Sequence, residues 1–295
     1  MGRNGTLRPG IQRGMRKKIS TDTVDATYGS IRLADRLLES LQEVGYDLGR
    51  LSAADLITFD ELHVMGRQAT LELGRLAGLT DAMRVLDIGC GLGGSARTLA
   101  AESGCRVTGI DLSAEFVNAA HLLSERVGLA EQVGFLNGDA LNLPFEENRF
   151  DAAFMVHVSM NIADKKGLFA EAGRVLTPGG KLVLWEIFET AESDLAYPVP
   201  WAEDESFSFL ISMTEMVALI EAAGFSPLHV DDATAEAAEW VRARLAPKQG
   251  RPPRLPRPDL DLVLGNFRQK RANLSKNLLR GAVGVLRAVA VKKNG

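Results

Sequence analysis

The pattern of apolar and polar positions predicts an alternation of strands and helices along the middle of the chain. Short runs of β-branched and aliphatic residues predict strands, and the apolar periodicity of the segments between them predicts helices. This alternation is typical of a parallel sheet with right-handed crossovers. We place the strands at 84–88, 106–110, 132–136, 151–156 and 180–187, and the helices between them at 94–103, 113–127 and 164–176.

Apolar spacing predicts further elements on both sides of this region. Before the first strand, leucines recur at helical spacing, and Ser52 is a typical N-cap residue. Near the C-terminus, an alternating run predicts a last strand. The predicted helices are 31–44, 52–63, 66–76, 213–223, one that ends at Leu245, and 265–280; the predicted strands are 225–234 and 282–291.

These elements predict a single α/β core with additions. We divide the chain into a flexible basic arm at 1–20, N-terminal helices with a lid at 21–80, and a core at 81–295. The core is interrupted by a cap insertion at 188–211 and by a Pro/Arg-rich insertion at 247–260. The cap combines prolines, which stiffen the backbone, with aromatic residues, which supply apolar walls. Such a segment suits the closing of a substrate pocket.

Composition limits the class of protein. With 295 residues and 46% hydrophobic residues the chain has ample material for a core. It has no apolar run of transmembrane length and no N-terminal hydrophobic segment of the signal-peptide type. Its two cysteines, Cys90 and Cys105, predict no disulfide framework and no cysteine metal site. We therefore expect a cytoplasmic protein without a bound metal and without a membrane partner.

The charge is unevenly distributed. Residues 1–18 contain six basic residues and no acidic one, and residues 247–295 contain twelve basic residues against two acidic ones. The body between them is therefore strongly acidic, since the whole chain has a net charge of −4. Basic ends leave open RNA binding, self-association into a homodimer, or solvated tails. We favour solvated tails, because the first segment is Gly-rich and weakly apolar.

The first predicted strand ends in a glycine-rich turn that opens the next helix. Gly89, Gly91 and Gly94 fit G-x-G-x-x-G, which favours a nucleotide-type ligand over a merely structural turn. Asp87 precedes the first glycine, where its carboxylate would repel a pyrophosphate and attract a cationic ligand. Asp111 ends the second strand, where an acid can accept hydrogen bonds from both ribose hydroxyls. Asp111 thus indicates an adenosine ligand, and Asp87 favours S-adenosylmethionine over NAD.

Four segments in order resemble the motifs of class I S-adenosylmethionine-dependent methyltransferases. They are Val85 to Gly94, Gly109 to Ser113, Gly138 to Phe145 and Arg174 to Gly180. The resemblance implies a Rossmann-like, seven-stranded, mostly parallel sheet with helices on both faces, an N-terminal helical segment and a cap insertion. It also implies S-adenosyl-L-methionine as cofactor, S-adenosyl-L-homocysteine as product, and no metal. The cofactor contacts that it implies are Asp87, Gly89, Gly91, Gly93, Asp111, Leu112, Asp139, Ala140, Val156 and His157.

The same resemblance suggests which residues of the chain contact the methyl acceptor. His157 follows the fourth strand, between cofactor and substrate, and imidazole can take a proton near pH 7. A histidine that only hydrogen-bonds the cofactor remains an alternative, as do a surface aromatic at Tyr28 and a turn aspartate at Asp139. We expect His157 and Tyr28 to be catalytic, with Tyr28 also acting as a lid over the substrate. Tyr197, Trp201 and Asn161 complete the predicted substrate contacts.

The sequence therefore predicts a methyltransferase that acts on an N, O or C atom of a small molecule. Asn161 stands in a segment without the Asn/Asp-Pro-Pro-Tyr/Phe motif common in enzymes that methylate nucleobase nitrogens, so we expect no nucleic-acid partner. The chain most resembles bacterial small-molecule enzymes near the sarcosine/dimethylglycine N-methyltransferases and natural-product tailoring methyltransferases. The acceptor class is then an amino-acid-like amine or a secondary metabolite. The alternatives are an NAD(P)-dependent oxidoreductase and a non-catalytic cofactor-binding protein of the same fold.

Overall fold

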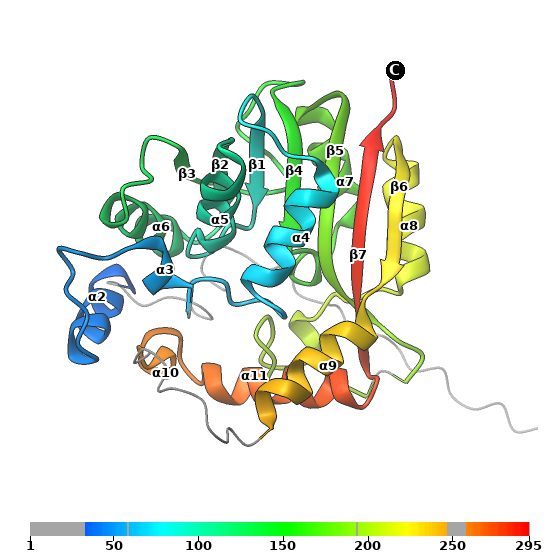
Figure 1. Ribbon diagram of the computed structural model, residues 1–295. Coiled ribbons are helices and arrows are strands. Elements are labelled where there is room, and N and C mark those ends of the chain that lie inside the picture. The colour runs from blue at the N-terminus through cyan, green and yellow to red at the C-terminus, as the bar shows by residue number, and fades with distance from the viewer. Residues whose placement is uncertain (1–32, 58, 193, 247–257, 295) are drawn as a thin grey trace, which may run out of the picture.

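A computed structural model gives the fold of the chain (Figure 1). It describes residues 33–57, 59–192, 194–246 and 258–294. The predicted arm at 1–20, Tyr28 and most of the Pro/Arg-rich insertion lie outside these residues. None of the helices that the structure places has both the length and the apolar character needed to cross a bilayer.

Seven strands form one mixed sheet. The order is β3-β2-β1-β4-β5-β7-β6, in which β1 to β5 are parallel and β7 is antiparallel to both of its neighbours. This confirms the predicted seven-stranded, mostly parallel sheet. The strands are β1 (Arg84–Ile88), β2 (Arg106–Asp111), β3 (Val133–Asn137), β4 (Phe150–Val156), β5 (Leu176–Glu189), β6 (Phe225–Asp232) and β7 (Val283–Lys292).

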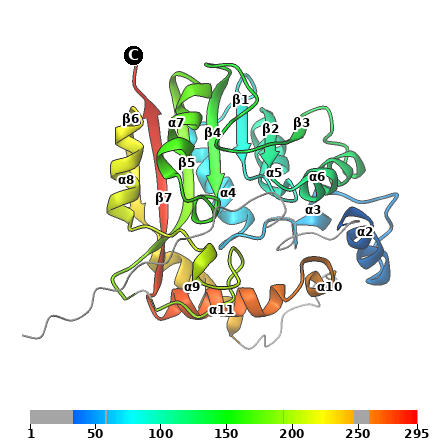
Figure 2. The same cartoon turned by 180° about the vertical axis from the view of Figure 1, so that it is seen from behind.

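Helices cover both faces of the sheet, as Figures 1 and 2 show from opposite sides. Side chains alternate along each strand, so Val85 packs in one core and Leu86 in the other. One core contains residues of α4 (Arg67–Ala77), α5 (Gly94–Ser103) and α6 (Ala114–Arg126). The opposite core contains residues of α7 (Lys165–Val175) and α8 (Met213–Ala222). Two buried cores on one sheet are the consequence of near-continuous apolar strands.

The remaining helices lie near the edge of the sheet at which the parallel strands end (Figure 1). Residues of α2, α10 and α11 pack with α6 in a third apolar cluster. This arrangement closes the crevice in which open α/β sheets bind their ligands. These helices are α2 (Leu33–Glu43), α3 (Ala53–Leu56), α9 (Thr234–Leu245), α10 (Leu260–Leu264) and α11 (Phe267–Leu279).

The helix predicted at 52–63 is wrong beyond its first turn. It begins after Ser52, as expected, but α3 ends at Leu56. The chain then turns inward, because the carboxylates of Asp60 and Glu61 have partners in α4 and α5. The α5 partners, Arg97 and Thr98, each lie 37 residues further along the chain, so local periodicity gave no sign of the turn. The five-residue helix α10 was not predicted either.

Candidate functional site

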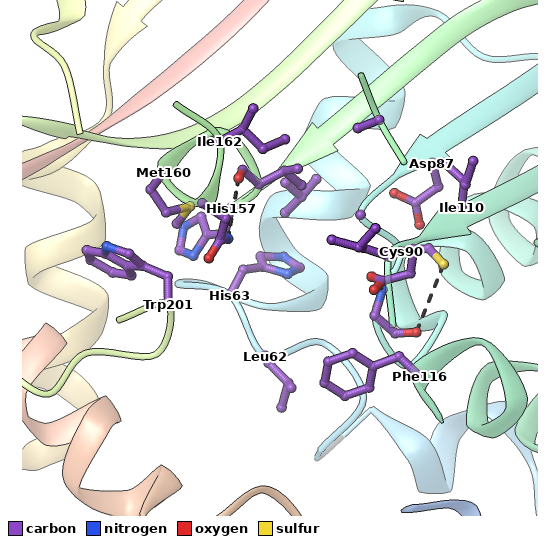
Figure 3. A pocket seen from close by; sticks show the side chains of 18 of the residues that line it. Leu62, His63, Asp87, Cys90, Ile110, Phe116, His157, Met160, Ile162 and Trp201 are labelled. Carbon is purple, nitrogen blue, oxygen red and sulfur yellow. Dashed lines mark hydrogen bonds between the residues drawn. The ribbon is translucent and has the colours of Figure 1, made fainter. Parts of the chain in front are cut away.

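A cavity of about 400 Å³ lies at the carboxyl ends of the parallel strands. It is lined by the ends of β1, β2 and β4, by the segment 60–63, and by Trp201 and Phe267 (Figure 3). Of the predicted site residues, eleven line this cavity. They are Asp87, Gly89, Gly91, Asp111, Leu112, Asp139, Ala140, Val156, His157, Asn161 and Trp201.

The glycine turn after β1 exposes backbone to the cavity. Gly89 and Gly91 have φ angles of 72° and 52°, in the left-handed region that favours glycine. A Cβ built on Gly91 would meet nothing within 4 Å, so the glycine leaves open space beside a ligand. Gly93 lies outside the cavity wall: it is the N-cap of α5, and a Cβ there would approach Phe135 to 2.6 Å. The structure therefore gives Gly93 a packing role, and its cofactor contact stays a prediction.

Asp111 is held in a fixed orientation at the end of β2. One carboxylate oxygen accepts a hydrogen bond from the Gly91 N–H at 2.9 Å, and the other accepts one from the Ser113 N–H at 2.9 Å. A carboxylate oxygen has a second lone pair. The carboxylate can therefore still accept from two neighbouring hydroxyl groups, such as those of a ribose. Leu112 supplies an adjacent apolar contact.

Asp87 is the most buried acid of the cavity. It is 1% exposed, and its Oδ2 atom is buried without a hydrogen-bond partner among the described residues. Burial, followed by the charges of Asp111 and Glu61, raises the pKa of Asp87 to about 7. A buried carboxylate with an unused acceptor is stabilised by a cationic ligand. The site thus fits a ligand with an ammonium or sulfonium group better than one with a phosphate.

Asp139 and Ala140 follow β3 and line the same cavity. The Asp139 side chain is exposed, and its Oδ1 accepts a hydrogen bond from the Leu141 N–H at 2.9 Å. This contact is the one expected of a turn aspartate. Because Asp139 also lines the cavity, the turn places its carboxylate where a ligand can contact it.

His157 directly follows β4 and has a φ of 57°, which is uncommon for a residue other than glycine. Its backbone N–H donates to the Trp185 carbonyl at 2.8 Å, while its ring atom Nε2 is buried and has no partner among the described residues. His63 packs edge-on against it, with ring centroids 5.9 Å apart (Figure 3). Burial, followed by the charge of His63, holds the pKa of His157 well below its usual value of 6.5. The imidazole is therefore neutral at pH 7.

A carboxylate that the sequence did not reveal fixes the loop after His157. Glu186 on β5 is fully buried and accepts hydrogen bonds from the Val158 N–H at 2.9 Å, the Ser159 N–H at 3.0 Å and the Ser159 hydroxyl at 2.6 Å. Lys165 reinforces the loop by donating to the Ser159 carbonyl at 2.8 Å. Burial raises the pKa of Glu186 to about 7. Glu186 contacts backbone rather than the cavity, so it positions the loop.

Glu61 is a second acid that sequence reasoning missed. Glu61 accepts a hydrogen bond from the Thr98 hydroxyl at 2.6 Å, and the Thr70 hydroxyl donates to its other oxygen. Burial, followed by the charge of Asp60, raises the pKa of Glu61 to about 7. Its partners lie in α4 and α5, so only the folded chain places this carboxylate in the cavity wall.

The cap insertion brings Trp201 to the cavity and ties it to α11. Trp201 is 3% exposed, and its indole N–H donates to the Ser208 hydroxyl at 3.0 Å. On α11, the Asn277 side chain donates to the Ala196 carbonyl at 3.0 Å and accepts from its N–H at 2.9 Å. Tyr197, in contrast, packs against the core and does not line the cavity, so its substrate contact stays a prediction.

Two further findings concern the predicted partners of the site. In the part of the chain that the structure describes, no three His, Cys, Asp or Glu side chains are grouped as ligands of a metal ion. Asn161 lines the cavity and donates to the Val158 carbonyl at 3.3 Å, within the loop that Glu186 holds.

Comparison with known proteins identifies a methyltransferase domain in this chain. Residues 86–184 match a family model described as "Methyltransferase domain". The chain is 31% identical over 166 residues to the sterol 24-C-methyltransferase ERG6A of Gibberella zeae, a match that covers 54% of this chain and 44% of that protein. The chain thus spans less than half the length of this curated relative.

Solved structures of low sequence identity share the fold. Geranyl diphosphate C-methyltransferase from Streptomyces coelicolor A3(2), solved with S-adenosyl-L-homocysteine, has a TM-score of 0.65 at 16% identity, covering 92% of this chain and 97% of that one. A putative sarcosine dimethylglycine methyltransferase from Galdieria sulphuraria has a TM-score of 0.59 at 17% identity, covering 88% and 98%. The predicted fold and family resemblance are confirmed, and these matches give no support to the NAD(P)-dependent alternative.

Proposed function

We propose that this chain, whose residues 86–184 are a class I S-adenosylmethionine-dependent methyltransferase domain, transfers a methyl group to an N, O or C atom of a small molecule. One observation carries the proposal: Asp87, Asp111 and His157 come from the ends of three different strands and line one cavity. The first two suit a cationic adenosine ligand, and His157 suits proton removal at the far side.

The residues present fit S-adenosylmethionine. Gly91 leaves room for its backbone to approach the ligand, Asp111 offers acceptors to the ribose hydroxyls, and the unpartnered oxygen of Asp87 suits the ligand's positive charge. When bound, this cofactor supplies an electrophilic methyl group, whose bond to sulfur breaks with the electron pair left on sulfur. The fixed strand ends contribute by orienting both ligands and excluding water.

His157 is the proposed base. When the acceptor's electron pair forms the new bond to the methyl group, positive charge develops on the acceptor, and a proton must leave from an amine, a hydroxyl or a carbon. The neutral imidazole offers Nε2 for that proton inside the cavity. Glu186, through Val158 and Ser159, keeps the loop in place.

The acceptor class is drawn from the relatives and the pocket together. The relatives include enzymes named for sterols, geranyl diphosphate and sarcosine, all small molecules. We propose an amino-acid-like amine or a secondary metabolite as acceptor, with self-association into a homodimer and no nucleic-acid or membrane partner. A cytoplasmic location agrees with two free and buried cysteines.

Methyl transfer from labelled S-adenosylmethionine to a panel of amines, phenols and alkenes tests the proposal. On an accepted substrate, His157→Ala is expected to lower turnover by roughly 10²–10⁴ with little change in cofactor affinity. His229→Ala is the matched control, because His229 pairs with Asp231 outside the cavity. Turnover that survives in His157→Ala would remove His157 from the mechanism. Cofactor binding with no transfer to any acceptor would favour a non-catalytic binding protein.

A further inference from the structure

We infer that the acceptor held in this cavity is an apolar molecule that carries no phosphate, sulfate or carboxylate group. The inference rests on the proposed function and narrows its substrate class. Its basis is the charge of the cavity wall: none of the described lining residues is a lysine or an arginine. The ionisable lining residues are two histidines, the thiol of Cys90, and six acids, namely Asp60, Glu61, Asp87, Asp111, Asp139 and Asp164.

Cationic side chains near the wall are engaged elsewhere. Arg97 forms a buried ion pair with Asp60 at 2.9 Å and donates to a backbone carbonyl at 2.7 Å. Lys165 donates to the carbonyls of Ser159 and Phe209 at 2.8 and 2.7 Å. Lys270, one turn along α11 from the lining residue Phe267, pairs with Glu203 at 2.5 Å. An anionic group would have to break such contacts to obtain a cationic partner.

The half of the cavity beyond the glycine turn is apolar. Figure 3 shows Trp201, Met160 and Ile162 grouped around His157, with Leu62 nearby. The Trp201 indole N–H is already bonded to Ser208, so the indole offers only its apolar surface to a ligand. This half therefore suits hydrocarbon.

The two imidazoles add no positive charge. His63 contacts the Gly66 carbonyl through Nε2 at 3.0 Å, and burial lowers its pKa to about 4. His157 is neutral for the same physical reason, and its Nε2 atom has no partner among the residues that the structure describes. A hydroxyl or a double bond can lie against such a wall, and the acids of the wall attract the ammonium group of an amine. A carboxylate or phosphate would lose its hydration there without gaining a partner, and the acids of the wall would repel it.

Four ligands with one carbon skeleton test the inference: geraniol, geranylamine, geranic acid and geranyl diphosphate. Their dissociation constants are measured by calorimetry on protein saturated with S-adenosylhomocysteine, with and without Mg²⁺. We expect geraniol and geranylamine to bind at least about ten-fold more tightly than either anion. An anion that binds as tightly as geraniol, in either buffer, overturns the inference. Failure of all four to bind overturns it too, because the cavity then does not accept apolar molecules.

A pair of variants at one position tests whether charge is the reason. Leu62→Arg adds a cation to the wall, and Leu62→Gln is the matched uncharged control. Leu62→Arg is expected to lower the ratio of the dissociation constant of geranic acid to that of geraniol at least about five-fold. Leu62→Gln is expected to leave this ratio unchanged. An unchanged ratio in Leu62→Arg contradicts the inference. The titrations are repeated without S-adenosylhomocysteine, so that the four ligands can be ranked by affinity even if the cofactor does not bind. Failure of the cofactor to bind would refute only the proposed function.

Discussion

Replacing Glu186 with glutamine tests how the chain positions its proposed base. The carboxylate accepts three hydrogen bonds, two from backbone N–H groups and one from the Ser159 hydroxyl. A glutamine amide keeps one acceptor oxygen and turns an NH₂ group towards at least one of these donors. Because Glu186 is fully buried, water does not replace the lost contact. The variant removes the acceptor while nearly preserving the shape of the side chain.

The expected effect follows from the lost contacts. A buried donor left without a partner costs about 1–3 kcal/mol, so Glu186→Gln is expected to lower the free energy of unfolding by about that amount. The loop that relaxes begins at His157, and misplacement of a reacting group by about 1 Å lowers turnover roughly 10²-fold. Ser159→Ala removes only the hydroxyl contact. We expect it to have a smaller effect in the same direction.

A double-mutant cycle separates positioning from general damage. Turnover and cofactor affinity are measured for Glu186→Gln, His157→Ala and the double variant. If Glu186 acts through His157, its substitution lowers turnover in the wild-type background and has little further effect once His157 is absent. Cofactor affinity stays within about two-fold, because Glu186 contacts neither Asp87 nor Asp111. An equal loss of turnover in both backgrounds would refute the positioning role.

Three further predictions follow from the same geometry. Because the pKa of Asp87 is raised to about 7, its carboxylate ionises between pH 6 and 8. The affinity for S-adenosylmethionine, relative to that for S-adenosylhomocysteine, which lacks the sulfonium charge, should therefore rise by up to about ten-fold over that range. Asp87→Asn should make this ratio, measured by calorimetry, independent of pH. Asp111→Asn, which removes one acceptor oxygen, should weaken cofactor binding by roughly 1.5–3 kcal/mol, and an unchanged dissociation constant would place the ribose elsewhere. Asn277→Ala removes the side chain that bonds both backbone groups of Ala196, so it should raise the KM for the acceptor several-fold with little change in cofactor affinity. The increase in KM should exceed that in Asn273→Ala, since Asn273 makes only one hydrogen bond with the cap.

The strands and most helices could be predicted because their signals are local. A sheet that is covered on both faces requires apolar residues at most positions of a strand such as β4, and the helices between strands keep one apolar stripe. The convergence of Asp87, Asp111 and His157 could also be predicted, since parallel strands end at one edge. For these residues the sequence order determines the spatial neighbourhood.

Glu61 and Glu186 could not be predicted, because their environment is made by contacts distant in sequence. Glu61 lies in the loop after α3, and its bond to Thr98 spans 37 residues. Glu186 lies inside an apolar strand, where a lone acid gives no sign of its loop partners 27 and 28 residues away. The helix expected at 52–63 failed for the same reason. The buried hydrogen bonds of Asp60 and Glu61 stabilise a loop after Leu56 more than the local sequence favours a helix.

Calorimetric titration with S-adenosylhomocysteine and with NAD tests the central claim most directly, because both ligands contain adenosine and ribose and only NAD carries a pyrophosphate. We expect one S-adenosylhomocysteine to bind per chain and NAD not to bind measurably, since Asp87, Asp111 and Glu61 disfavour a phosphate beside the glycine turn. Binding of NAD at least as tight as that of S-adenosylhomocysteine would contradict it.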